Sequence, residues 1–256
     1  MKEEKVLIKG VESNFKIAGE GKPLLILHGW GVGSSNSWRN VQRILSALGY
    51  TVVVPDFPGF GKSGKPGKAW SISDYVEWLN SFVNSLKLRK FSVIAHSFGA
   101  RVAVKFINRY PGKVDKLILC SPAGIKPKAS LETKMVFLVT KIGNIILKTK
   151  HLEKPKKGLR RLFYVFLPHK DYTKAQGVMK ETIKKVLAED LTGYLSKIDK
   201  KTLIVWGKRD KIVPLRHIRI FDDKIKGSQL VVLAGAGHSP HLKCPEKLLE
   251  KIIKFL

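Results

Sequence analysis

The sequence predicts an α/β protein built on a mostly parallel, twisted sheet that is covered by helices on both faces. Apolar, β-branched strand patterns alternate with amphipathic helix patterns along most of the chain. Parallel strands need a helical crossover between them, and strands buried on both faces form continuous apolar runs. The 256 residues, of which 44% are hydrophobic, are enough for one sizeable core.

The predicted elements begin with an antiparallel start over residues 5–18. The strands and helices that follow are predicted, in order, at 24–27 (strand), 38–48 (helix), 51–54 (strand), 73–86 (helix), 91–94 (strand), 100–110 (helix) and 116–120 (strand). A buried strand is predicted at 202–206, and a further strand at 229–233.

This alternation stops between the two halves of the chain. Residues 125–195 contain no convincing strand pattern, and helix patterns at 132–147, 156–166 and 174–187 take its place. A connection of this length between two strands is expected to have its own structure. We therefore predict a helical cap at 125–195, inserted into a core made of residues 1–124 and 196–256.

Ser97 lies where a predicted strand gives way to a predicted helix, within the pentapeptide 95–99, Ala-His-Ser-Phe-Gly. A sharp turn between strand and helix exposes such a serine and points it at the positive end of the helix. Ser97 is therefore a candidate nucleophile.

An acid and a histidine follow two later strands. Asp210 comes shortly after the strand at 202–206, and His238 follows the strand at 229–233. The carboxyl ends of parallel strands line one crevice, so residues far apart in sequence can meet there. The order Ser97, Asp210, His238 matches nucleophile, acid and base in hydrolases of this architecture.

Five motifs together resemble the α/β-hydrolase family over nearly the whole chain. Besides the elbow, they are Leu-Leu-Ile-Leu-His-Gly-Trp-Gly at 24–31, Asp-Phe-Pro-Gly-Phe-Gly-Lys-Ser at 56–63, Gly-Lys-Arg-Asp-Lys-Ile-Val-Pro at 207–214 and Gly-His at 237–238. The elbow departs from the family pattern because Ala95 replaces its first glycine. We expect the fold to tolerate this additional methyl group.

The resemblance and the residue types imply acyl transfer through a covalent acyl-enzyme. His238 would take the proton of Ser97, and Asp210 would orient the imidazole. The main-chain N–H groups of Trp30 and Phe98 would stabilise the oxyanion. We expect a carboxylic ester hydrolase that acts on a small-molecule ester and needs no metal or organic cofactor.

Each of these residues also has a structural interpretation. Ser97 could be a helix N-cap, Asp210 could belong only to a turn, and His238 could be a hydrogen-bonded core histidine. His96 and His241 are expected to be packing or supporting residues rather than the base.

Two other residues of the motifs are expected to be structural. His28 should shape the loop in which it lies, and Asp56 should cap a turn.

Two other functions remain open. A carbon–carbon bond hydrolase of the meta-cleavage-product type is weakly supported by Asn40, but Val32 replaces the proline of that subgroup's H-G-x-G-P-G loop. The alternative from another class is a non-catalytic protein of this fold that binds an anionic surface or polymer. Relatives that open epoxides carry aspartate at the elbow, where this chain has Ser97.

The chain is strongly basic, with a formal net charge of +28 and a sequence pI of about 10.1. Residues 126–185 hold 16 Lys and Arg against four acids, a net charge of +12, beside apolar runs at 135–139 and 142–147. This combination suits peripheral contact with an anionic membrane surface, and a solubility role explains it equally well. Nucleic-acid binding is not expected, since no recognition motif accompanies the charge.

The sequence also bears on localisation. No run approaches the ~18 apolar residues of a membrane-spanning helix, and no signal peptide is recognised. Cys120 and Cys244 do not form a disulfide framework or a metal-site pattern. We therefore expect a cytoplasmic protein with reduced cysteines.

Overall fold

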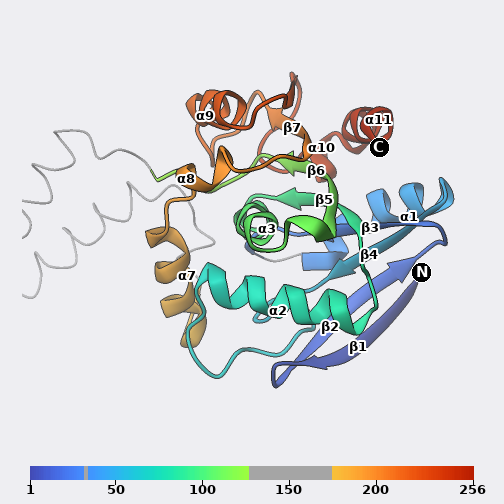
Figure 1. Cartoon of the computed structure of the whole chain (residues 1–256), viewed down its shortest axis with the longest axis vertical. Helices are drawn as coiled ribbons and strands as arrows, with labels where there is room; N and C mark the ends of the chain where they lie inside the picture. Colours follow the sequence, from blue (N-terminus) through green and yellow to red (C-terminus); the bar gives the residue numbers. More distant parts are fainter. Residues whose placement is uncertain (32–33, 127–174) are drawn as a thin grey trace, which may run out of the picture. The chain divides into compact units, whose positions relative to one another are not determined.

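The computed structural model describes residues 1–31, 34–126 and 175–256, which contain one eight-stranded sheet (Figure 1). The sheet has the order β1-β2-β4-β3-β5-β6-β7-β8. Its strands are β1 (Lys2–Ile8), β2 (Val11–Ala18), β3 (Lys22–Leu27), β4 (Tyr50–Pro55), β5 (Phe91–His96), β6 (Val114–Cys120), β7 (Lys201–Gly207) and β8 (Gln229–Leu233).

The pairing is antiparallel only at the first edge of the sheet. β1 and β2 form a hairpin in which Ile8 pairs with Val11, and β2 runs antiparallel to β4. From β4 to β8, each neighbouring pair is parallel. The predicted class, a mostly parallel α/β sheet with an antiparallel start, is confirmed.

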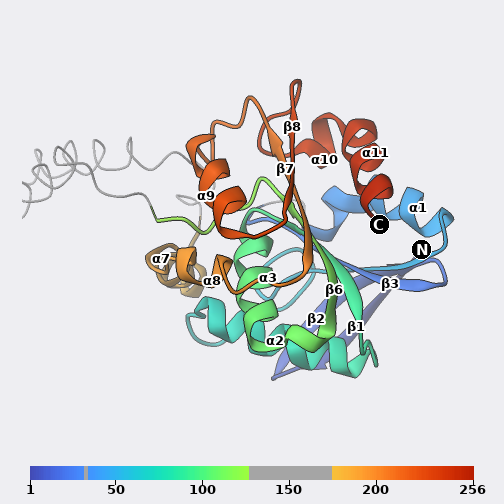
Figure 2. The ribbon, with the colours of Figure 1, turned by 45° about the horizontal axis from the view of Figure 1, so that its top comes forward.

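Helices lie on both faces of the sheet (Figures 1 and 2). The α-helices described are α1 (Arg39–Ala47), α2 (Ile72–Ser85), α3 (Phe98–Arg109), α7 (Val178–Ala188), α8 (Thr192–Leu195), α9 (Arg216–Lys224), α10 (Pro240–Lys243) and α11 (Pro245–Phe255). Two 3-10 turns accompany them, η1 (Ser34–Trp38) and η2 (Pro111–Lys113).

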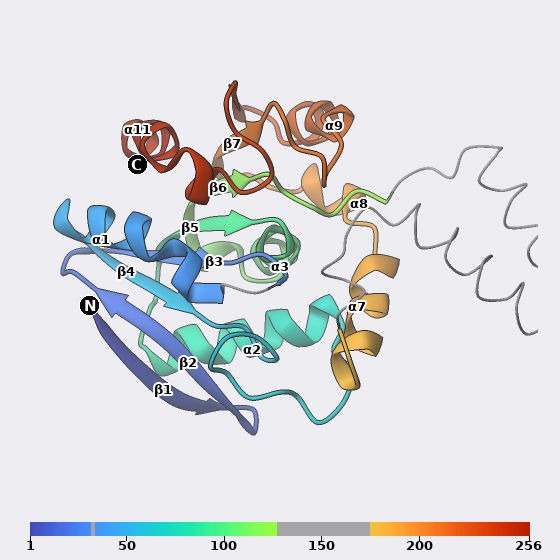
Figure 3. The same cartoon turned by 180° about the vertical axis from the view of Figure 1, so that it is seen from behind.

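The core has two parts because strand side chains alternate between the two faces. In β3, Leu25 and Leu27 join a cluster with side chains of α2, α3 and α9. Leu24 and Ile26 join the opposite cluster, with side chains of α1 and α11. Figure 3 shows α1 and α11 from behind, on the side of the sheet away from α2 and α3.

Most of the predicted cap falls outside the described residues. The helices expected at 132–147 and 156–166, with the apolar runs between 135 and 147, belong to the undescribed range 127–174. The last part of the predicted cap is described: Trp70 N–H donates to Thr182 Oγ1 of α7 at 3.1 Å, and Lys185 Nζ donates to the Ala69 carbonyl at 2.9 Å. The boundaries of the cap therefore stay a prediction.

None of the helices in the described ranges has the length and apolar character needed to cross a membrane.

Candidate active site

Ser97 occupies a strained turn between β5 and α3. Its φ is +50°, in the left-handed region that β-carbon-bearing residues rarely adopt. The backbone is fixed on both sides of the serine. Ser97 N–H donates to the Cys120 carbonyl at 3.2 Å, and Ala123 N–H donates to the Ser97 carbonyl at 3.3 Å. The predicted elbow is thus present and is pinned to the end of β6.

Two glycines allow the backbone to pass close to this turn. A β-carbon on Gly99 would lie 2.4 Å from the Leu27 carbonyl oxygen, so only glycine fits where α3 meets the end of β3. A β-carbon on Gly29 would lie 3.3 Å from Cβ of Ser97. The loop after β3 therefore lies directly against the serine.

The three residues predicted for catalysis meet at the carboxyl ends of β5, β7 and β8. Ser97 Oγ lies 3.0 Å from His238 Nε2, and His238 Nδ1 lies 2.9 Å from Asp210 Oδ2. Because the carboxylate accepts from Nδ1–H, His238 Nε2 is left free to accept the serine proton. The exposed fraction of the side chain is 11% for His238 and 0% for Asp210.

Asp210 is held as a carboxylate by donors on both of its oxygens. Oδ1 accepts the N–H groups of Ile212 and Val213 at 2.8 and 2.9 Å, and Oδ2 faces His238. Burial acts to raise the pKa of Asp210, but His238 and these two N–H groups outweigh it and lower the pKa. Asp210 is therefore a turn residue and the partner of His238 at once.

The side chain of Ser97 does not act as a helix N-cap. Ser97 does occupy the N-cap position of α3, but its hydroxyl makes no capping hydrogen bond. The hydroxyl meets His238 Nε2 instead.

The residues predicted for the oxyanion hole flank the serine. Phe98 is the first residue of α3, so its N–H has no partner within the helix. Trp30 follows Gly29, and its ring packs edge to face on Phe60 and Phe98 with centroids 4.7 and 5.3 Å apart. Aromatic rings thus pack on one another next to the turn that holds Ser97.

His28 and Asp56 have the structural roles expected of them. His28 Nδ1–H donates to the Gly29 carbonyl at 2.7 Å, and its Nε2 accepts the Phe57 N–H at 3.0 Å. This neutral ring joins two loops, and burial lowers its pKa. Asp56 accepts the N–H groups of Ser35 and Lys62 at 2.7 and 3.0 Å, which fixes the turn after β4.

His96 and His241 lie beside His238 without replacing it. His96 Nε2 lies 2.8 Å from the His238 carbonyl oxygen. The ring of His241 stacks on Trp38 at a centroid distance of 4.1 Å. The expectation that neither is the base agrees with these contacts. The hydrogen bond from His96 to the His238 carbonyl was not predicted from the sequence. The position of His96 next to the candidate nucleophile was the available sequence signal for it.

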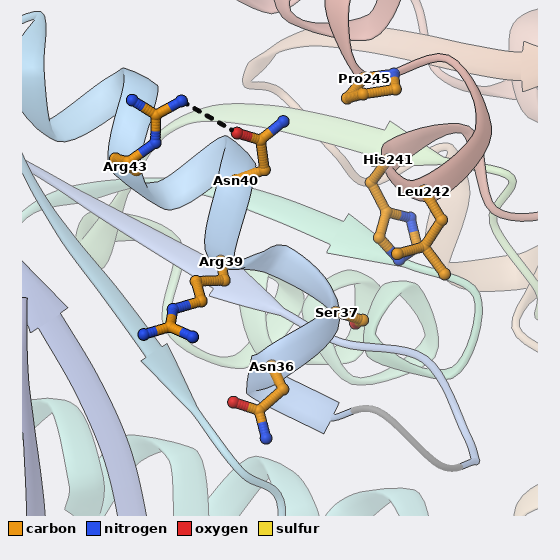
Figure 4. A pocket seen from close by; sticks show the side chains of 8 residues that line it. All are labelled: Asn36, Ser37, Arg39, Asn40, Arg43, His241, Leu242 and Pro245. Atoms are coloured by element: carbon orange, nitrogen blue, oxygen red, sulfur yellow. Dashed lines mark hydrogen bonds between the residues drawn. The ribbon is translucent and has the colours of Figure 1, made fainter.

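Asn40, the residue that weakly suggested a carbon–carbon bond hydrolase, lies on α1 at the surface. Its Oδ1 accepts from Arg43 at 3.3 Å, and it lines a pocket of about 420 Å³ with Arg39 and His241 (Figure 4). None of the contacts described for Asn40 is with Ser97. Asn40 therefore adds no support to the carbon–carbon bond hydrolase.

Both cysteines lie among the residues that the structure describes. Cys120 and Cys244 are free thiols, and burial raises the pKa of Cys120 to about 12. Within the described ranges, no three His, Cys, Asp or Glu side chains are grouped as a metal ion requires.

Comparison with known proteins extends these observations to the whole chain. A family model described as the alpha/beta hydrolase fold matches residues 22–145 and 147–245. An uncharacterised protein of Mycobacterium tuberculosis is 28% identical over 97% of this chain and 79% of its own. A 2-hydroxy-6-oxo-6-phenylhexa-2,4-dienoate hydrolase of Burkholderia cepacia is 28% identical over 88% of this chain and 86% of its own.

A solved esterase from Exiguobacterium antarcticum is similar in structure, with a TM-score of 0.76, 23% identity and 99% of both chains covered. This likeness shows the shared fold, and the family model covers most of the chain from β3 to the start of α11. The protein therefore belongs to the α/β-hydrolase family.

Proposed function

We propose that this protein is a serine hydrolase that cleaves carboxylic esters of small molecules through a covalent acyl-enzyme. The observation that carries the proposal is the unbroken series of hydrogen bonds from Ser97 Oγ to His238 and from His238 to Asp210. Each member has the partner that its role requires, and the serine stands on a strained turn beside the loop after β3.

In the first half of the reaction, Ser97 Oγ attacks the ester carbonyl carbon while its proton passes to His238 Nε2. The new oxyanion accepts hydrogen bonds from the main-chain N–H groups of Trp30 and Phe98. Asp210 stabilises the positive imidazolium, which then gives its proton to the leaving alcohol as the carbon–oxygen bond breaks. An ester between Ser97 and the acyl group remains.

In the second half, water takes the place of the alcohol. The water oxygen attacks the acyl carbon while His238 accepts a proton from that water. His238 then gives this proton to Ser97 Oγ as the serine ester breaks. The products are a carboxylic acid and the regenerated enzyme, so all atoms and protons balance without a cofactor.

The aromatic residues packed around the turn of Ser97 favour an uncharged acyl group. The rings of Trp30, Phe60 and Phe98 pack on one another beside the serine, and Phe57 and Tyr75 extend the same cluster. Aromatic surfaces of this kind bind apolar groups without recognising charge.

A second candidate is hydrolysis of a carbon–carbon bond in a dienoate. It is favoured by the names of several relatives at 23–28% identity, which are dienoic acid hydrolases. The two candidates share the nucleophile, so the substrate must separate them.

The deciding experiment uses an activity-based probe and two substrate types. A fluorophosphonate should label the wild-type protein and should fail to label Ser97→Ala. Ser121→Ala is the matched control, because Ser121 is also a buried serine with positive φ at the end of a neighbouring strand. Absence of labelling in a folded wild-type protein would contradict the proposal.

The substrate comparison then follows. Turnover of p-nitrophenyl acetate and butyrate, with none of a 2-hydroxy-6-oxo-dienoate, is the expected result. Faster turnover of the dienoate would favour the carbon–carbon bond hydrolase.

The basic insertion suggests a location for this activity. We propose that the protein makes peripheral contact with anionic lipid, because residues 126–185 carry a net charge of +12. Vesicles containing acidic lipid should bind the protein better than neutral vesicles, and salt should weaken that binding. Equal binding to both vesicle types would indicate that the positive charge serves solubility instead.

A further inference from the structure

His96 is a buried histidine that the acyl-transfer steps do not use. It ends β5, directly before Ser97, and its exposed fraction is 5%. Its Nε2 lies 2.8 Å from the main-chain carbonyl oxygen of His238, 142 residues further along the chain. A carbonyl can only accept, so the hydrogen of this bond must be on His96 Nε2.

This bond gives His238 a second point of attachment to the same short segment. Ser97 meets the His238 ring at Nε2, at 3.0 Å. The residue immediately before the serine holds the His238 main chain. Two consecutive residues, His96 at the end of β5 and Ser97 in the turn after it, therefore contact both the backbone and the ring of His238.

The His96 ring is itself confined on several sides. A β-carbon on Gly29 would lie 2.6 Å from His96 Nδ1, so the loop after β3 closes on one edge of the ring. The ring of His241 lies edgewise to His96 with centroids 4.8 Å apart, and His241 stacks on Trp38 with an interplanar angle of 3°. Figure 4 shows His241 on α10, where it lines the pocket beside α1. The ring has little freedom to turn away from its partner.

The charge of His96 fits this role. Burial, together with the nearby His241 and His238, holds the pKa of His96 well below its usual range, so the ring stays neutral near neutral pH. A neutral ring with its hydrogen on Nε2 can donate to the carbonyl. It also places no positive charge beside His238 when that ring becomes an imidazolium.

We propose that His96 is a second positioning residue for His238 beside Asp210, and that its Nε2–H bond to the His238 carbonyl sets the distance between the His238 ring and the Ser97 hydroxyl. This inference rests on the proposed function, because it assigns His96 to the reaction that Ser97 and His238 carry out.

The first test compares two substitutions of similar length that differ in the donor. The amide of His96→Gln can reach the place of Nε2 and donate to the carbonyl, whereas His96→Met cannot. His96→Met should lower kcat by about 10²-fold, the scale of an ångström-sized misplacement, with KM little changed. His96→Gln should recover most of that loss.

His217→Met is the matched control, because His217 is buried to the same 5% and lies on α9 with no described contact to His238. It should keep the wild-type kcat. Equal kcat in His96→Gln and His96→Met, whether both are active or both are impaired with intact melting curves, would overturn the proposal.

A second measurement covers the case in which His96→Met does not fold. In the wild-type protein with ¹³C,¹⁵N-labelled histidine, NMR at neutral pH should show His96 as the neutral ring with hydrogen on Nε2, coupled across the bond to the His238 carbonyl. A hydrogen on Nδ1, or a protonated ring, would overturn the proposal. Because this readout needs no turnover, it separates a failure of the inference from a failure of the esterase assignment, in which wild type itself would neither label nor hydrolyse esters.

Discussion

Two buried aspartates, Asp56 and Asp210, follow the ends of parallel strands of this sheet and have different consequences. Asp56 follows β4 and accepts from Asn14 Nδ2 and from two main-chain N–H groups. Asp210 follows β7 and also accepts two main-chain N–H groups, but its second oxygen faces His238.

The difference between the two sites lies in one partner. The donors around Asp56 cannot accept or release protons near neutral pH, so that site can only hold its turn. The imidazole beside Asp210 can change its protonation state, and it contacts a serine on its other side. The same residue type in the same topological place thus holds a turn in one case and, in the proposed reaction, is the partner of the catalytic histidine in the other.

The largest expected effect comes from removing the charge at Asp210. In Asp210→Asn, kcat for a p-nitrophenyl ester should fall by about 10⁴-fold, because an amide no longer fixes the correct tautomer of His238. The double variant with Ser97→Ala should lose no more than Ser97→Ala alone, since the three residues act as a unit. Steady-state kinetics with melting curves test this, and near-normal turnover in Asp210→Asn would remove Asp210 from the proposed reaction.

The second effect concerns Asp56 and is on stability rather than on activity. Asp56→Ala should lower the free energy of unfolding by about 3 kcal/mol, because it leaves buried donors such as the Ser35 N–H without an acceptor. Urea unfolding measures the loss. Asp56→Asn, which retains one acceptor oxygen, is the control and should cost less. An Asp56→Ala protein of wild-type stability would show that water replaces the carboxylate at little cost.

The third effect is a loss of stability in acid, and it comes from His241. Burial, with smaller contributions from His238 and His28, lowers the pKa of His241 to about 3 from its ordinary value of 6.5. Between these values the unfolded chain binds a proton that the folded chain does not, so stability falls as pH decreases below about 6.5. At pH 5 this group alone should account for about 2 kcal/mol.

His241→Phe keeps an aromatic ring against Trp38 and removes that titration. Its free energy of unfolding should therefore change less between pH 7.5 and pH 5 than that of the wild type, as measured by urea unfolding at both values. The same slope in both proteins would mean that His241 takes up its proton in the folded state as readily as in the unfolded chain.

The smallest effect concerns the elbow itself. Ala95 is fully buried in β5, at the place of the first glycine of the elbow pattern that the chain resembles. Ala95→Gly should lower stability by about 1 kcal/mol, through lost burial and added chain entropy, with kcat nearly unchanged. Thermal melting and ester kinetics test both parts. A clear rise in kcat would show that the methyl group constrains the turn at Ser97.

Local patterns were enough to predict most of the elements of the core. The strand predicted at 229–233 is β8 at the same bounds, and the helix predicted at 73–86 is α2 at Ile72–Ser85. Such elements follow from apolar periodicity and capping, and Ser71 and Asp74 form a capping box at the start of α2. These signals lie within a few residues, so the sequence alone contains them.

The sequence by itself determined the fold class and the three residue types at the strand ends, because the order of strands and the motifs after them are linear properties. Only the tertiary structure decided that Ser97 Oγ and His238 Nε2 lie 3.0 Å apart and that His96 holds the His238 carbonyl. It also decided that Asn40 lies at the surface. Contacts between residues about 140 positions apart depend on strand order and on close approaches such as Gly29 against Ser97, which no local pattern records.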